Sequence, residues 1–411
     1  MKIKTTSIQK LLIILCILSQ SSFFHLVDST GMLALTTLLI LVTFSISIIY
    51  KIQNPYIDKY ILEVICLVFL LQGFYTVLFK NQDIISYITA ISPMLAILLV
   101  RPLYIAFIKN HNFYDLLDII SFLMNIYMCI IILNAFLINI NGNVLVNTDY
   151  FLQDFGMRSD RLRIMIDSPF QLIMPIYSFS MIIDRAKCKK LHYFTFLIHT
   201  FALFYVTQTR ILIVTFVITI SIMISMKIPQ KKYKYILYVF VFFTIVIGLS
   251  KGVFDSFFSS FSINNYENGS STRTRLIELE IAIKNWLKNP ILGTGITLDY
   301  KMPMSQYGYR FIYNYTDLGL IGSISYMGIS FIVLFIMPVV RHLRFITHVT
   351  KKYRQNKEFI IYIGLLTYIC VSSFTILITD NFRIFGWPFV LAILEYLKWN
   401  FRYSITYEQK D

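Results

Sequence analysis

Residues 116–140 read LLDIISFLMNIYMCIIILNAFLINI, a run with one acidic residue, Asp118, and no basic one. A bilayer core about 30 Å thick is crossed by a helix of about 20 mostly apolar residues. Comparable runs follow one another along most of the 411-residue chain. The pattern predicts a polytopic helical membrane protein.

The predicted fold is all-α, a single integral membrane domain over residues 1–411 with about twelve transmembrane helices. The chain is 57% hydrophobic and 14% charged, whereas soluble domains have about 45–50% apolar and about 25% charged residues. Long apolar runs, rather than period-two alternation, argue against a membrane barrel. The expected spans are 11–28, 32–50, 60–79, 84–100, 116–140, 168–184, 191–208, 211–226, 235–250, 317–340, 359–379 and 386–398.

The 37 basic residues indicate the orientation of these spans. With a cytoplasmic N-terminus, 24 of them fall in short inside segments, as the positive-inside rule requires. Twelve spans then leave both termini in the cytoplasm. Because the basic runs are short inside loops, the net charge of +15 is explained by the membrane and gives no support for nucleic acid as a partner.

Two outside loops, 141–167 and 251–316, are much longer than the other connections. Long loops of this kind often carry function. Within the second loop we expect an amphipathic helix near 275–289, lying on the outer membrane surface or capping a cavity. Its apolar residues recur at helical spacing: Leu276, Leu279, Ile283, Trp286 and Leu287.

Arginine is enriched on the outside. The outside segments hold 8 arginines and 5 lysines, and the inside segments hold 6 arginines and 18 lysines. The planar guanidinium binds phosphate oxygens in paired hydrogen bonds, whereas lysine offers a point charge. The enrichment favours an anionic outside ligand such as a lipid-linked diphosphate, and the alternative is ordinary pairing with nearby acids.

Two charged residues next to spans are candidates for chemistry. Arg210, in Thr207-Gln-Thr-Arg210, lies between two apolar runs with almost no loop, and a charge so near the membrane core is costly. It either binds substrate or extends to the outer headgroups. Asp317 opens the span after the second long loop, where it either complements the helix dipole or assists a sugar hydroxyl.

Other chemistries lack support. The chain has no Gly-rich phosphate loop, no G-x-G-x-x-G and no G-x-S-x-G, and its six histidines show no zinc-ligand spacing. We therefore expect no metal and no cofactor.

Four stretches resemble the O-antigen polymerase and O-antigen ligase superfamily of bacterial surface-polysaccharide assembly. They are Arg161-Leu-Arg163 through Pro169, Thr207 through Arg210, Arg273-Thr-Arg275 with the following Trp286, Asn289-Pro290 and Gly293-Thr-Gly295, and Asp317-Leu-Gly319-Leu-Ile-Gly322. Their order and membrane side agree with the family. Many members have a His-Asn pair where this chain has Tyr313-Asn314, and the 251–316 loop has no histidine; this favours polymerase over ligase.

The resemblance implies a metal-independent membrane glycosyltransferase of the GT-C type in the bacterial inner membrane. Its partners would be glycan donor and acceptor linked to undecaprenyl diphosphate, membrane lipid and a chain-length regulator. The product would be O-antigen of lipopolysaccharide, or capsule. The catalytic candidates are Arg210, Asp317, Arg273 and Arg275. The substrate-binding candidates are Arg161, Arg163, Trp286, Gly293, Gly295, Tyr313 and Asn314.

Two other functions stay open. An O-antigen ligase would move finished polymer to another acceptor. A flippase would carry the lipid-linked oligosaccharide across the membrane, and it should show repeat-related halves. The chain has no evident halves and one asymmetric outside loop, so the flippase is the weaker alternative.

Overall fold

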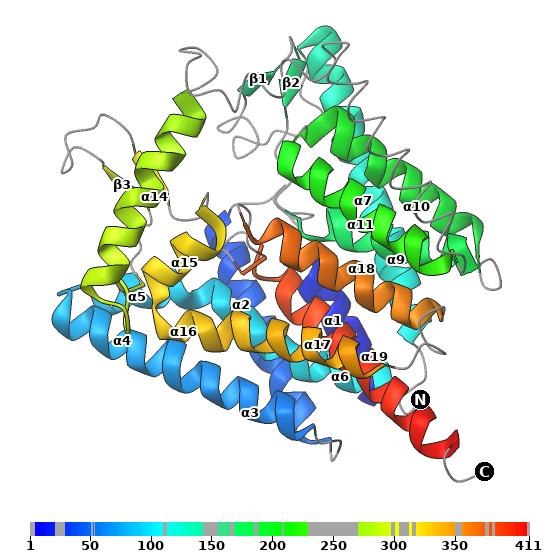
Figure 1. The fold of residues 1–411 in the computed structure, drawn as a ribbon, viewed down its shortest axis with the longest axis horizontal. Coiled ribbons are helices and arrows are strands. Elements are labelled where there is room, and N and C mark those ends of the chain that lie inside the picture. The colour runs from blue at the N-terminus through cyan, green and yellow to red at the C-terminus, as the bar shows by residue number, and fades with distance from the viewer. Residues whose placement is uncertain are drawn as a thin grey trace.

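The computed structural model shows a mostly helical protein (Figure 1). It describes residues 5–20, 29–50, 52, 54–109, 113–142, 156–158, 161–163, 168–184, 188–207, 209–228, 270–296, 301–303, 312–314, 318–349, 356–374, 378–379 and 383–408.

The elements up to residue 141 are α1 (Thr5–Gln20), α2 (Ser29–Ile48), α3 (Pro55–Val64), η1 (Ile65–Leu71), α4 (Gln72–Phe74), η2 (Tyr75–Phe79), α5 (Ile84–Ile91), η3 (Ser92–Leu99), α6 (Val100–Lys109) and α7 (Phe113–Asn141). Those up to residue 314 are β1 (Gly156–Arg158), β2 (Arg161–Arg163), α9 (Phe170–Asp184), α10 (Lys190–Phe201), η4 (Ala202–Thr207), α11 (Arg210–Lys227), α14 (Ser270–Lys288), β3 (Lys301–Pro303) and β4 (Ile312–Asn314). The remaining elements are α15 (Gly319–Met327), α16 (Ile329–Phe331), η7 (Ile332–Ile336), α17 (Met337–His348), α18 (Lys357–Ser372) and α19 (Gly386–Glu408).

Several described helices are long and apolar enough to cross a membrane. Four meet this test by length and composition among the described residues: Pro55–Phe79, Ile84–Lys109, Phe113–Ile140 and Ile329–His348. Shorter apolar helices are Ser7–Ser19, Ala34–Ile48, Phe170–Asp184 and Ile211–Lys227. Each expected span overlaps a described helix except 235–250, which lies outside the described residues. The protein is therefore a polytopic helical membrane protein, as predicted.

Large apolar side chains on the outside of the helices fit a lipid environment. Along the rod formed by α3, η1, α4 and η2, Leu62, Leu70, Phe74 and Leu78 are 56–63% exposed. Exposed apolar surface of this kind is rare on a soluble monomer, and in a bilayer it faces lipid chains.

The sequence sets where some helices begin. Asn54 caps α3, because its side-chain oxygen accepts hydrogen bonds from the backbone N–H groups of Tyr56 (3.1 Å) and Ile57 (3.4 Å), and Pro55 occupies the first helical position, where its missing N–H costs nothing. Asp83 caps α5 in the same way, accepting from Ile85 and Ser86.

The helices form two packed groups that are visible in Figure 1. In the first group, α6 packs against α19 and α2, and buried Trp387 of α19 donates a hydrogen bond to the Tyr60 hydroxyl at 2.8 Å. Tyr60 in turn donates to the carbonyl of Leu334 at 2.9 Å, which joins α3 and η7 to α19.

In the second group α9 packs against α10, α11 and α18. Gly364 of α18 allows this contact, since a Cβ there would lie 2.8 Å from both Ile176 and Met223.

The architecture is helical, as predicted, and the described residues add two short hairpins that the sequence did not predict. Strands β1 and β2 form one antiparallel hairpin, and β3 and β4 form another. Strands of three residues are too short to produce the alternation by which a strand is predicted from sequence.

Basic residues of the expected inside segments form ion pairs with acids on neighbouring helices. Arg101 of α6 pairs with Asp58 of α3, and Lys189 donates to Asp118 of α7 at 2.6 Å. On α17 Arg341 pairs with Glu395 of α19, whose side chain is 3% exposed, and His342 lies 3.1 Å from the same carboxylate. These pairs connect helices, and they give part of the lysine and arginine content a structural role.

We predict that Arg341→Met destabilises the protein by roughly 3 kcal/mol, because it removes the ion pair between Arg341 and the buried Glu395 carboxylate. Arg344→Met, at an exposed position on the same helix, is the matched control and should cost less than about 0.5 kcal/mol. Thermal unfolding in detergent measures both. Equal shifts in the two variants would contradict the assignment.

Candidate functional site

The Thr207–Arg210 turn connects η4 to α11. Thr209 is the N-cap residue with extended backbone (φ −79°, ψ 105°), and its hydroxyl donates to the carbonyl of Thr207 at 3.3 Å. Arg210 is therefore the first residue of α11. A cation at a helix N-terminus is opposed by the helix dipole by about 0.3–1 kcal/mol, so the stability of α11 does not explain an arginine there.

Buried polar side chains join this turn to the start of α9. Gln171 donates a side-chain hydrogen bond to the hydroxyl of Thr207 at 3.1 Å, and Thr207 donates to the carbonyl of Leu203 at 3.0 Å. The ring Nδ1 of His199 donates to the carbonyl of Gln171 at 3.2 Å. Gln171, His199 and Thr207 are each at most 1% exposed. The set fixes the end of η4 against the N-terminal turn of α9.

Pro169 fixes the same end of α9 against α19. A Cβ built on Gly386, the first residue of α19, would lie 2.4 Å from the Cβ of Pro169. The proline of the resembling stretch therefore packs against a glycine more than 200 residues later, and together they position the segment that follows Arg161 and Arg163.

The β1–β2 hairpin brings the first arginine pair to the same region. Arg158 is the register partner of Arg161, and Gly156 is the partner of Arg163. Strand β2 contacts both α7 and η4. The backbone of Arg161 and Arg163 thus lies next to the element that ends at Thr207.

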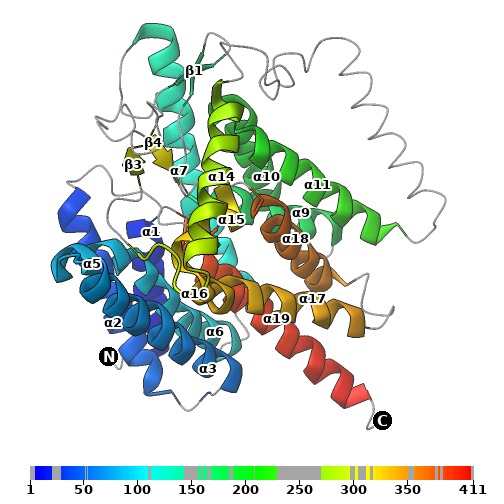
Figure 2. The ribbon, with the colours of Figure 1, turned by 60° about the vertical axis from the view of Figure 1, so that its left-hand side comes forward.

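Helix α14 carries Arg273 and Arg275 near its N-terminus. Both views show the N-terminal end of α14 at the same end of the molecule as β1 and the C-terminal end of α7 (Figures 1 and 2). All three arginine-bearing segments are therefore at one end of the helical bundle.

The buried face of helix α14 is not the face that carries most of the predicted apolar stripe. Glu278, Ile281 and Ala282 are buried at 5% exposure or less, and α14 packs against α15. Most of the predicted apolar stripe is on the exposed side: Leu276, Ile283, Trp286 and Leu287 are 37–68% exposed. An exposed apolar stripe is compatible with a helix on the membrane surface; whether α14 lies there or caps a cavity stays a prediction.

The Asn289–Gly295 turn docks on a break between α15 and α16. The backbone N–H groups of Thr294 and Gly295 donate to the carbonyls of Ser325 (2.9 Å) and Tyr326 (3.1 Å). In return the N–H of Ile329, the first residue of α16, donates to the carbonyl of Ile291 at 2.8 Å. The helix expected at 317–340 is thus interrupted, and the loop satisfies the backbone groups that the break exposes.

A buried side chain from the N-terminal half completes this junction. Gln72 of α4, which is fully buried, donates to the carbonyls of Leu292 (2.9 Å) and Met327 (2.8 Å). One amide group therefore holds the loop and the broken helix together.

Glycine is required at two positions in the junction. Gly293 has φ +67°, and a Cβ there would lie 2.6 Å from the carbonyl oxygens of Ser325 and Tyr326. Gly328 has φ +58°, and its Cβ would lie 2.2 Å from the carbonyl oxygen of Ile291. Gly293 thus has a structural role, and its contribution to substrate binding stays a prediction, as does that of Gly295.

The structure describes the remaining candidates to different extents. Trp286 is 37% exposed on α14. Tyr313 and Asn314 lie in β4, paired with Met302 and Lys301. For these two and for the arginines at 161, 163, 210, 273 and 275, the description covers the backbone. Asp317 lies outside the described residues. Among the described residues, no group of three His, Cys, Asp or Glu side chains is placed to hold a metal ion.

Sequence reasoning missed three residues of this region. Gln72, Gln171 and His199 are polar side chains inside apolar helices, which is itself a signal of function or of specific packing. Their partners come from distant segments, which a linear pattern does not reveal.

The fold is that of a polytopic helical membrane protein. Its arginine-bearing segments, which are β2, the Thr207–Arg210 turn and the N-terminal end of α14, lie at one end of the helical bundle. Within this class, residues 195–318 are similar to the O-antigen ligase family, whose model they match. The match covers the Thr207–Arg210 turn, α14 and the Gly293–Gly295 turn, so the resemblance is confirmed there. The family contains O-antigen ligases and polymerases, membrane enzymes that join polysaccharide units from lipid-linked glycans. A comparison with curated proteins gave no match.

We predict that Gly293→Ala destabilises the protein more than Gly142→Ala does. Both glycines have φ +67°, but a Cβ at Gly142 would meet nothing within 4 Å. Gly142→Ala should therefore cost only the backbone strain of about 1–2 kcal/mol, and Gly293→Ala should cost that plus the displacement of α15. Thermal unfolding of both variants in detergent gives the comparison. Equal losses would show that the junction is not close-packed.

Proposed function

We propose that the protein is a polymerase that joins oligosaccharide repeat units linked to undecaprenyl diphosphate on the outer leaflet of the bacterial cytoplasmic membrane. The observation that carries the proposal is the placement of Arg210 at the N-terminus of α11, inside the region that matches the family and three residues after the end of η4, the element that β2 with Arg161 and Arg163 contacts. Several arginines at one end of a membrane protein are suited to a diphosphate.

The chemistry explains the need for arginine. The acceptor hydroxyl oxygen bonds to the anomeric carbon of the donor sugar, the bond from that carbon to the diphosphate oxygen breaks, and the hydroxyl proton passes to a base. The leaving diphosphate gains negative charge in the transition state, and fixed cationic donors stabilise that charge. Arg210, Arg273 and Arg275 are the candidates for this role, and Asp317 is the candidate base.

Arg161 and Arg163 would bind the diphosphate of the donor or of the acceptor. Trp286 and Tyr313 would stack on sugars, with Asn314, Gly293 and Gly295 shaping the same region. The orientation, with both termini cytoplasmic and about twelve spans, is part of this proposal, as is the GT-C type of fold without metal or cofactor. A chain-length regulator is the expected protein partner.

Ligase activity is the second candidate function. The description of the matching family favours it, whereas the absence of histidine from 251–316 favours the polymerase. Both reactions release a lipid diphosphate and use the same arginines, and they differ in the acceptor.

A gel of surface glycan from a deletion strain distinguishes the functions. We expect single repeat units on the surface, because export continues while chain growth stops. Long polymer that remains lipid-linked would instead show a ligase, and loss of nearly all exported glycan would show a flippase.

Arg210→Lys should abolish long chains while the protein stays in the membrane. Lysine keeps the charge but loses the paired hydrogen bonds, and loss of one donor that stabilises transition-state charge slows an enzyme by about 10²–10³-fold. Arg344→Lys, at an exposed position outside the matched region, is the control and should leave chain length unchanged. Complementation of the deletion strain, with membrane levels checked by immunoblot, measures both. Normal polymer from Arg210→Lys would refute the mechanism.

A further inference from the structure

A proline inside α9 leaves one backbone carbonyl without its helical partner. Pro175 lies within the helix, and it has no N–H to donate to the carbonyl of Gln171, four residues earlier. Gln171 is 1% exposed, so this carbonyl needs another donor inside the protein. His199 of α10 supplies it: a carbonyl only accepts hydrogen bonds, and the ring Nδ1 lies 3.2 Å from this oxygen.

The same contact decides which ring nitrogen of His199 carries a proton. With the proton on Nδ1, the Nε2 atom of the neutral ring only accepts hydrogen bonds. The His199 side chain is 0% exposed, and its Nε2 has no hydrogen-bond partner among the described residues. A buried acceptor without a partner is unfavourable. The favourable polar contribution of this ring therefore comes from Nδ1.

The side chain of Gln171 connects this contact to the Thr207–Arg210 turn. Its amide donates to the hydroxyl of Thr207 at 3.1 Å. The carbonyl of Thr207 accepts from the hydroxyl of Thr209, the N-cap residue of α11, at 3.3 Å. Arg210 is the next residue. A run of hydrogen bonds, joined through Gln171 and Thr207, thus leads from His199 to the first residue of α11.

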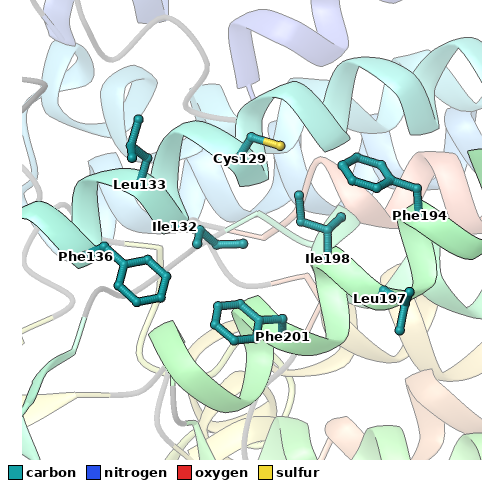
Figure 3. A pocket seen from close by; sticks show the side chains of 8 residues that line it. All are labelled: Cys129, Ile132, Leu133, Phe136, Phe194, Leu197, Ile198 and Phe201. Atoms are coloured by element: carbon teal, nitrogen blue, oxygen red, sulfur yellow. The ribbon is translucent and has the colours of Figure 1, made fainter.

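Packing restrains α10 less on its other side. An apolar groove with a cavity volume of about 610 Å³ lies there between α10 and α7. Figure 3 shows Leu197, Ile198 and Phe201 of α10 along one wall of this groove, and Leu197 is 66% exposed. Contacts across an open groove are fewer than in a close-packed interface. The hydrogen bond from His199 on the packed side therefore matters more for the position of α10.

We propose that His199 is a positioning residue for Arg210, in which the ring Nδ1–H takes the place of the backbone N–H that Pro175 lacks. It acts through Gln171 and Thr207 and touches no substrate. The inference rests on the proposed function, in which Arg210 stabilises the leaving diphosphate, and it adds the residues that place this arginine. Because the charge on the diphosphate grows in the transition state, a displaced Arg210 lowers turnover more than substrate affinity.

The first test measures turnover by the full-length protein in nanodiscs, with lipid-linked glycan extracted from the deletion strain as substrate. His199→Leu removes the donor and should lower kcat by about 10–100-fold, since a displacement of about 1 Å costs up to about 10²-fold. KM should change by less than about three-fold. An unchanged kcat in His199→Leu would overturn the proposal.

The conservative variant His199→Asn should restore turnover. The amide Nδ2 of asparagine occupies nearly the same place as the ring Nδ1, and the unpaired Nε2 is removed. We expect kcat within about three-fold of wild type. A well-folded His199→Asn that is as slow as His199→Leu would overturn the proposal, because the chemistry would then depend on Nε2.

His192→Leu is the matched control for loss of a buried histidine from α10. His192 is also 0% exposed and lies about two turns before His199 on the same helix. Its loss should lower the melting temperature but leave kcat per folded molecule within about two-fold of wild type. An equal fall of kcat in both leucine variants would reduce the effect to general weakening of α10 and overturn the proposal.

The second test is a double-mutant cycle in thermal unfolding, which needs no substrate. Pro175→Ala restores a backbone N–H that reaches the carbonyl of Gln171. The loss of melting temperature caused by His199→Leu should therefore be less than about half as large with alanine at 175 as with proline. The kcat of the double variant should also rise toward that of Pro175→Ala. Additive losses in the cycle would overturn the pairing of Pro175 with His199.

The two readouts separate this inference from the proposed function. A wild-type protein that extends no lipid-linked glycan would overturn both, even if the unfolding cycle shows coupling. A wild-type protein that extends the glycan, together with a His199→Leu variant of normal kcat, would overturn the positioning role alone.

Discussion

The need to satisfy polar groups inside the hydrocarbon governs this structure. Backbone N–H and C=O groups have no water to bind there, so the chain crosses as helices that bond internally. The break at Gly328 tests this rule, because it frees donors and acceptors between α15 and α16. The Asn289–Gly295 turn and Gln72 supply the missing partners, and glycine at 293 and 328 lets the backbones approach closely enough. An interrupted helix thus becomes a rigid attachment point for the C-terminal end of α14.

The same rule applies to the side chains near Arg210. Gln171, His199 and Thr207 are buried, and each makes a hydrogen bond to a neighbouring segment. These bonds join α9, α10 and η4 at the end where β2 also contacts η4. Because Pro169 packs on Gly386, that end is fixed from the other side by α19. The segments that carry Arg161, Arg163 and Arg210 are therefore attached to packed helices, as the proposed electrostatic role would require.

The basic residues fall into two populations with different physical roles. Arg101, Lys189 and Arg341, from expected inside segments, pair with carboxylates and hold helices together. Five of the arginines expected outside, at 161, 163, 210, 273 and 275, belong to the segments gathered at one end of the bundle.

The amino-acid sequence alone indicated the membrane class, the approximate limits of the apolar helices and the resemblance to the O-antigen ligase family, because apolar run length and short motifs are local properties. It also predicted a helix within the second long loop. It did not predict the two hairpins, because strands of three residues are too short to show an alternating pattern. It predicted the apolar face of α14, but not that most of this face is exposed and that Glu278, Ile281 and Ala282 are buried instead. Only the tertiary structure showed that Gln72 holds Leu292 and Met327, that Gln171 reaches Thr207, and that α7 and α10 enclose a groove. These features depend on contacts between residues far apart in the chain. Hydrophobic periodicity indicates which face of a helix is apolar, but it does not indicate which segment packs against that face.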